Sequence, residues 1–153
     1  MGVVSPDAVN LVRQSFHMLD AVSHQAAGMF YGRLFTIAPE VKPMFGEADM
    51  LQQAEKLWKM LAWIVGALDK PEVLLPAAGK LAVTHVGYGV VPAHYAVVGD
   101  ALIWTLATGL GPRFDTETKD AWAAAYTALS GAMIAAAEAT GATPDAEPIT
   151  ETE

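Results

Sequence analysis

His85 is the residue of this 153-residue sequence best placed to bind a metal. It follows Ala78 and Leu81 at helical spacing, which puts all three on one core-facing side of an expected helix. Glycines and a proline then interrupt the pattern, and Tyr95 is the first large side chain of the next helix. A neutral imidazole at such a corner has one nitrogen to offer a metal, and the next helix begins close enough to support it. Most single histidines on an apolar face are ordinary packed side chains, so this segment alone predicts either a metal ligand or a core histidine.

Composition excludes several classes of function. The formal net charge of −8 argues against nucleic acid and anionic membranes as partners. The absence of cysteine excludes disulfides, thiolate ligands and thiol nucleophiles. No apolar run approaches the roughly 18 residues that span a bilayer, and no cationic stretch precedes an apolar segment at the N-terminus. We therefore expect a cytoplasmic protein without membrane insertion.

Helical periodicity extends through most of the chain and predicts an all-α fold of roughly six main helices plus a short turn. No stretch alternates apolar and polar residues over enough positions to require a strand. The turn falls between Pro39 and Phe45, and residues 46–50 are expected to form a loop. The first expected helix starts at Ser5, the second covers residues 22–35 and the third covers residues 54–68. The fourth begins just after Pro76, and the fifth extends from Tyr95 to Gly111. The sixth runs from a cap at Asp115 or Thr116 to Gly141.

The last residues differ in composition from the rest. Residues 141–153 contain two prolines, four acidic residues and a single large apolar residue, Ile149. Such a segment cannot bury enough apolar surface to fold. We expect one folded domain over residues 1–140 and an acidic, disordered tail over 141–153.

Several motifs in this order resemble one family. They are Phe-Tyr-x-x-Leu-Phe at residues 30–35, Pro39-Glu40-Val41, Phe45, Gln53 with Leu57, His85, and His94-Tyr95. The set is similar to bacterial globins, and more narrowly to single-domain haemoglobins and the globin domain of flavohaemoglobins, over about residues 5–137. The resemblance implies a globin fold that holds haem b (iron protoporphyrin IX) in a crevice between the distal helix, 54–68, and the proximal helix that carries His85.

The resemblance also implies roles for the residues that would hold the haem. His85 corresponds to the iron ligand, Phe45 to the aromatic that stacks on the porphyrin, and Leu81 to a haem contact. Tyr95 corresponds to a tyrosine that, with a glutamate of the last helix, forms hydrogen bonds around the proximal histidine. A carboxylate there would make the imidazole a stronger electron donor, which favours O–O chemistry.

This sequence departs from the family at that glutamate. Ala137 stands at its position, and the next residue, Glu138, is turned by about 100° on an ideal helix. A π-bulge could restore the carboxylate, whereas a regular helix would leave Glu138 in solvent. The departure puts nitric oxide dioxygenation in doubt.

On the distal side, Tyr31 corresponds to a tyrosine whose hydroxyl can donate a hydrogen bond to the gas ligand. Gln53 corresponds to the distal position of the 54–68 helix, and Leu57 to the apolar wall over the iron. Gln53 is chosen over Gln52 because Leu57 follows it by one helical turn on the buried side, whereas Gln52 aligns with Lys56. Glutamine there, with no histidine on that face, disfavours coordination by two histidines.

Two main functions compete. The first is reversible binding of dioxygen for storage or delivery. The second is a nitric oxide dioxygenase, in which Tyr31, Gln53 and Tyr95 would act on the reaction; no reductase segment follows the last helix, so we expect an external reductase to supply electrons. A haem-based gas sensor and a haem-free helical bundle are further alternatives. The expected ligands are dioxygen, NO and CO, and the expected state is a monomer or homodimer.

Overall fold

The computed structural model describes residues 4–46, 49–87 and 90–140. This part of the chain forms six α-helices, three short 3₁₀ segments and no strand, which confirms the predicted all-α class. The α-helices are α1 (Pro6–Leu19), α2 (Ser23–Ile37), α3 (Met50–Gly66), α4 (Pro71–Gly87), α5 (Pro92–Leu110) and α6 (Thr116–Thr140). The 3₁₀ segments are η1 (Asp20–Val22), η2 (Pro39–Phe45) and η3 (Gly111–Arg113). The expected tail, 141–153, and parts of the 46–50 loop and of the glycine corner lie outside the described residues.

Two α-helices begin at the capping residues that the sequence predicts. The Ser5 hydroxyl accepts a hydrogen bond from the Ala8 N–H at 3.2 Å and begins α1. The Asp115 carboxylate accepts one from the Thr118 N–H at 2.8 Å, which identifies Asp115 rather than Thr116 as the cap of α6. These side chains satisfy backbone donors that the first helical turn leaves without partners.

The predicted start of the His85 helix is wrong. Helix α4 begins at Pro71, and Pro76 lies inside it. Pro71 occupies the first helical position, where a missing N–H costs nothing. Pro76 lies beyond the first turn, so it both removes the hydrogen bond to the Glu72 carbonyl and crowds that carbonyl with its ring. Helix α3 also begins earlier than expected, at Met50.

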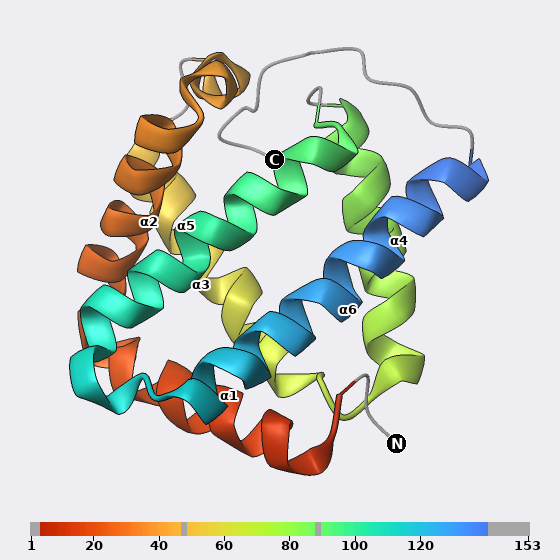
Figure 1. The fold of residues 1–153 in the computed structure, drawn as a ribbon. Helices are drawn as coiled ribbons and strands as arrows, with labels where there is room; N and C mark the ends of the chain where they lie inside the picture. The colour runs from red at the N-terminus through yellow and green to blue at the C-terminus, as the bar shows by residue number, and fades with distance from the viewer. Residues whose placement is uncertain (1–3, 47–48, 88–89, 141–153) are drawn as a thin grey trace.

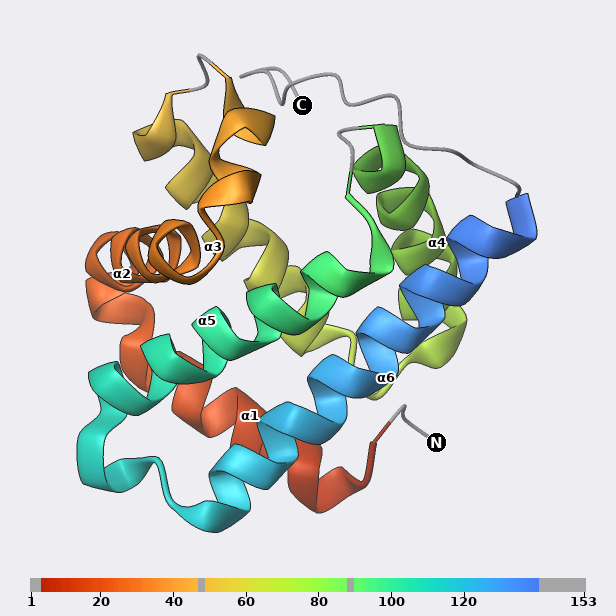
Figure 2. The same ribbon diagram turned by 45° about the horizontal axis from the view of Figure 1, so that its top comes forward.

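The helices cross one another around a common interior (Figures 1 and 2). Helices α5 and α6 run antiparallel, and α4 lies along the C-terminal half of α6. The other main contacts are α2 with α5, α1 with α6 and α2 with α3. None of the described helices is long and apolar enough to cross a membrane.

The apolar core has two parts. The main cluster joins all six α-helices, with Leu74 as the member from α4, and includes Val12 and Trp122. A smaller cluster of Ala78, Ala82 and Met133 joins α4 to α6. Helix α3 packs with the main cluster, while most of the buried face of α4 packs on α6.

Candidate functional site

Three aromatic side chains meet where α2, η2 and α3 come together. The Tyr31 ring lies edge-on to Phe45, with centroids 5.4 Å apart and an interplanar angle of 81°. Phe35 contacts both rings, at centroid distances of 6.0 Å from Tyr31 and 5.4 Å from Phe45. Phe35 lies one helical turn after Tyr31, and this i, i+4 spacing is the signal that identifies it as part of the site. Edge-to-face packing holds the Tyr31 and Phe45 rings in defined orientations.

Tyr31 and Gln53 are also brought together. The Tyr31 hydroxyl donates a hydrogen bond to the backbone carbonyl of Gln53, at a long distance of 3.4 Å. Burial raises the pKa of Tyr31 to about 12, so the phenol is protonated and remains a donor near neutral pH.

The Gln53 side chain is 6% exposed, whereas its neighbour Gln52 is exposed. The buried Nε2 of Gln53 has no hydrogen-bond partner in the described part of the chain. A buried amide donor without a partner costs free energy, so it marks a place where a polar ligand atom would be favoured.

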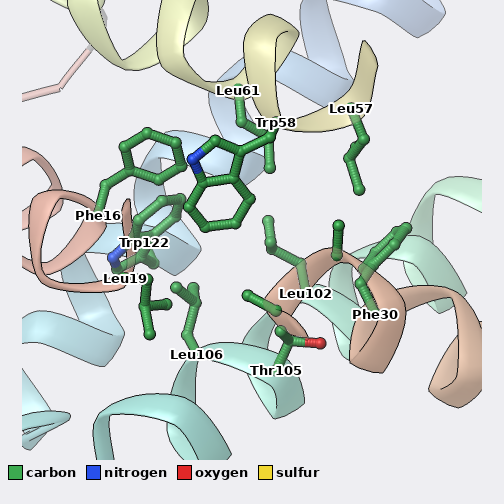
Figure 3. A pocket seen from close by; sticks show the side chains of 12 residues that line it. Phe16, Leu19, Phe30, Leu57, Trp58, Leu61, Leu102, Thr105, Leu106 and Trp122 are labelled. Carbon is green, nitrogen blue, oxygen red and sulfur yellow. The ribbon is translucent and has the colours of Figure 1, made fainter. Parts of the chain in front are cut away.

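Leu57 lies one turn beyond Gln53 and faces the main core (Figure 3). With Phe30 and Leu102 it lines a cavity of about 10 Å³ among α1, α2, α3, α5 and α6. The Thr105 hydroxyl, which also lines it, already donates to the Ala101 carbonyl at 2.8 Å. Leu57 therefore provides an apolar wall next to the distal polar pair.

His85 is oriented by its own helix. Its Nδ1 lies 2.6 Å from the Leu81 carbonyl, and because a carbonyl only accepts, Nδ1 must carry the proton. The lone pair of the neutral ring is then on Nε2, the atom that coordinates a metal. Burial lowers the pKa of His85, while the hydrogen bond to Leu81 acts in the opposite direction. The net effect favours the neutral form of the ring.

Tyr95 lies in the first turns of α5, half-buried against the small α4–α6 cluster that Leu81 also contacts. Its backbone carbonyl accepts a hydrogen bond of 2.6 Å from the Tyr126 hydroxyl. Tyr126 fits against Gly99, where an added Cβ would lie 2.7 Å from Tyr126 Cε2. The sequence placed Tyr126 on the inner face of α6 but did not identify this bond, because it depends on how closely α5 and α6 approach.

Glu138, one residue after the position of the family's glutamate, does not join the contacts of Tyr95 and Tyr126. Helix α6 is a regular α-helix through Ala137, without a π-bulge, and Glu138 is exposed. Among the described residues, no hydrogen bond connects Tyr95 with His85 or Glu138. The structure thus agrees with the solvent-exposed alternative for Glu138.

The other histidines are not arranged as metal ligands. His94 Nδ1 accepts a hydrogen bond of 3.1 Å from the Val91 N–H at the start of α5. His17 and His24 are exposed. The described chain contains no group of three or more His, Cys, Asp or Glu side chains that could hold a metal ion.

The site residues thus form two sets. Tyr31, Phe45, Gln53 and Leu57 lie on α2, η2 and α3, whereas Leu81, His85 and Tyr95 lie on α4 and α5. One set offers neutral hydrogen-bond donors in an aromatic and apolar setting, and the other offers an oriented neutral imidazole.

Known proteins are similar to this chain in sequence and in fold. Residues 28–133 match the family model of the globins. A flavohemoprotein of Deinococcus radiodurans is 35% identical over 136 residues, and one of Bordetella bronchiseptica is 34% identical over 134; each alignment covers 86% of this chain and 33% of the relative. The chain thus spans about a third of the length of these curated relatives. The fold is similar to a bacterial globin from Campylobacter jejuni, with a TM-score of 0.77 and 25% identity over 90% of this chain and 99% of that one.

Proposed function

The chain belongs to the globin family, whose members bind diatomic gases at haem, and from this premise we propose that it binds dioxygen reversibly at haem b. The observation that carries the proposal is the buried Gln53 amide, whose Nε2 has no partner in the described chain and which lies beside the protonated Tyr31. Residues 1–140 would form the globin domain.

The residues present fit a haem. His85 Nε2 would ligate the iron, and Phe45, Leu57 and Leu81 would pack against the macrocycle, with Tyr95 on the proximal side. Haem iron with one histidine ligand supplies a reversible bond to a diatomic gas. Helices α3 and α4 are not among the closely packed pairs of the described helices, which is consistent with a large planar group between them.

The distal residues would select among gases. The Tyr31 hydroxyl and the Gln53 amide are neutral donors, and hydrogen bonds favour dioxygen over the less polar carbon monoxide. Leu57 and the neighbouring apolar core would keep bulk water away from the ligand. Tyr31 would turn from the Gln53 carbonyl to the ligand at little cost, because its present hydrogen bond is long at 3.4 Å.

Absorption spectroscopy of the purified protein tests this function. We expect a Soret band that shifts when carbon monoxide is added to the ferrous protein. His85→Ala should lose tight haem binding in a haem titration, whereas His94→Ala should retain it, since His94 caps α5. Full haem occupancy and an unchanged spectrum in His85→Ala would overturn the ligand assignment.

Nitric oxide dioxygenation is a second candidate, favoured by the similarity to flavohemoproteins. It would need electrons from a reductase. Stopped-flow mixing of the oxygenated protein with NO, followed by turnover with an added flavin reductase, tests it. Nitrate formation without sustained turnover would leave dioxygen binding as the main function.

A further inference from the structure

A second pocket lies away from the distal residues, where the end of α4, the start of α5 and the end of α6 meet. Its volume is about 210 Å³. Its described lining includes neither His85 nor any distal residue, but it adjoins the proximal side: Tyr95 lines it, and so does Val90, whose N–H donates a hydrogen bond of 3.1 Å to the His85 carbonyl. Val86 comes from α4, Tyr95 from α5, and Ile134, Ala137 and Glu138 from α6. We propose that this pocket binds a small organic ammonium ion with an apolar body.

The walls of the pocket are apolar with two polar exceptions. Of its eight described lining residues, six are apolar and only Tyr95 and Glu138 carry polar side-chain groups. The Tyr95 hydroxyl has no hydrogen-bond partner in the described part of the chain. Glu138 is exposed, so its carboxylate lies at the mouth. The pocket therefore offers apolar surface, one neutral hydroxyl and one negative charge.

The pocket lies at the C-terminal ends of α4 and α6. Farther back they pack closely through small residues: a Cβ added to Gly79 would lie 3.7 Å from the Ala136 Cβ. At the pocket the small side chain on α6 is Ala137, which does not fill the gap between Val86 and Tyr95. The volume is below that of pockets for drug-sized ligands and suits about ten non-hydrogen atoms.

Electrostatics favour a cation here. The last turns of two helices, α4 at Val86 and α6 at Glu138, line the pocket, and helix C-termini carry partial negative charge. One helix N-terminus, that of α5, opposes them, but its Val91 N–H is already bonded to His94. The Glu138 carboxylate and the net charge of −8 act in the same direction as the two C-termini.

Two other occupants fit less well. A carboxylate-bearing molecule would meet Glu138 and two negative helix ends. Residues 141–153 follow α6 directly, but they carry four acidic residues, which Glu138 would repel, and only Ile149 as a large apolar anchor. An ammonium ion with an aromatic or aliphatic body matches both the walls and the charge.

Three probes of one shape separate these possibilities: 2-phenylethylamine, 2-phenylethanol and phenylacetate. Binding is measured by protein-detected NMR titration at low ionic strength, without any haem signal, so this proposal and the proposed function can fail independently. We expect the amine to bind about two- to fivefold more tightly than the alcohol, the ratio typical of an exposed ion pair, and phenylacetate to bind least.

Matched variants locate the site. Glu138→Gln should remove the preference for the amine, whereas Glu117→Gln, the same charge change in the first turn of α6, should leave it intact. Ala137→Leu should weaken all three probes by filling the pocket, and its circular dichroism spectrum would verify folding.

Several results would overturn the proposal. One is that phenylacetate binds most tightly of the three probes. Another is that Glu138→Gln keeps the preference for the amine over the alcohol. A third is that Glu138→Gln and Glu117→Gln lose equal parts of that preference, which would reflect net charge alone. A several-fold gain in amine affinity on Ile149→Ala would identify the acidic segment as the occupant instead.

Discussion

Replacement of Tyr31 by Phe removes one hydroxyl and keeps the ring. The lost hydrogen bond to the Gln53 carbonyl is 3.4 Å long, and the aromatic contact with Phe45 needs only the ring. We therefore expect the free energy of unfolding to change by less than about 1 kcal/mol. The variant should fold and take up haem normally, so its effect on the gas ligand can be read separately.

The effect on dioxygen dissociation should be much larger. A hydrogen bond to a charged or strongly polar acceptor contributes about 1.5–3 kcal/mol, which corresponds to a factor of roughly 10 to 150 in rate. The Gln53 amide can supply part of this in the variant, because its Nε2 has no partner in the described structure. We expect Tyr31→Phe to speed dissociation by about tenfold or more, and Tyr31→Phe with Gln53→Leu to exceed either single change.

Stopped-flow displacement of dioxygen by carbon monoxide measures these rates. Gln52→Leu is the matched control, since Gln52 is the exposed neighbour of the buried Gln53, and its rate should stay within about twofold of the original. If Tyr31→Phe and Gln53→Leu also stay within twofold, the distal assignment is refuted.

Three further changes test the packing and charges that hold the helices in place. Arg13→Ala removes hydrogen bonds of 3.2 and 2.9 Å to carbonyls at the end of α3 and a 2.9 Å ion pair with Asp69, and should cost about 1–2 kcal/mol in urea unfolding. Asp69→Asn should cost less than Arg13→Ala, because the ion pair is exposed to solvent, and equal losses in the two variants would assign the effect to the ion pair. Gly99→Ala should cost about 1–3 kcal/mol, since its Cβ would overlap the Tyr126 ring, and unchanged thermal unfolding would show that the ring can move. The Tyr31 pKa of about 12 lies above its ordinary value of 10, so the unfolded chain releases this proton at lower pH than the folded chain does. The free energy of unfolding should therefore fall as pH rises from 10 to 12. Tyr31→Phe should remove up to about 2.7 kcal/mol of that fall, as measured by urea unfolding across this pH range.

The fold was predictable from the sequence because its helices carry their own signals. Ser5 and Asp115 cap helices where the sequence indicates, and the apolar periodicity places each buried face. The start of α4 was not predicted because Pro71 and Pro76 are both admissible as first residues. Tertiary packing of α4 on α6 is consistent with the longer helix, and this packing cannot be read from local preferences.

The candidate site was predictable where it depends on helical register. The spacing of Gln53 and Leu57 places Gln53 inside and Gln52 outside, as the structure has them. The hydrogen bond from Tyr31 to the Gln53 carbonyl could not be predicted, since it depends on how α2 packs against α3. The contact of Tyr126 with Gly99 likewise depends on the approach of α5 to α6.

A shift of one residue on α6 links the haem proposal to the second pocket. Because the helix is regular through Ala137, a methyl group faces the gap beside Tyr95, and the neighbouring carboxylate of Glu138 lies at the mouth. His85 then has its Nδ1–H directed to the Leu81 carbonyl, a neutral acceptor that polarises the imidazole less than a carboxylate would. A less polarised imidazole favours reversible gas binding over O–O chemistry. The same alanine therefore supports the dioxygen-binding proposal and leaves the space in which we propose that a cationic ligand binds.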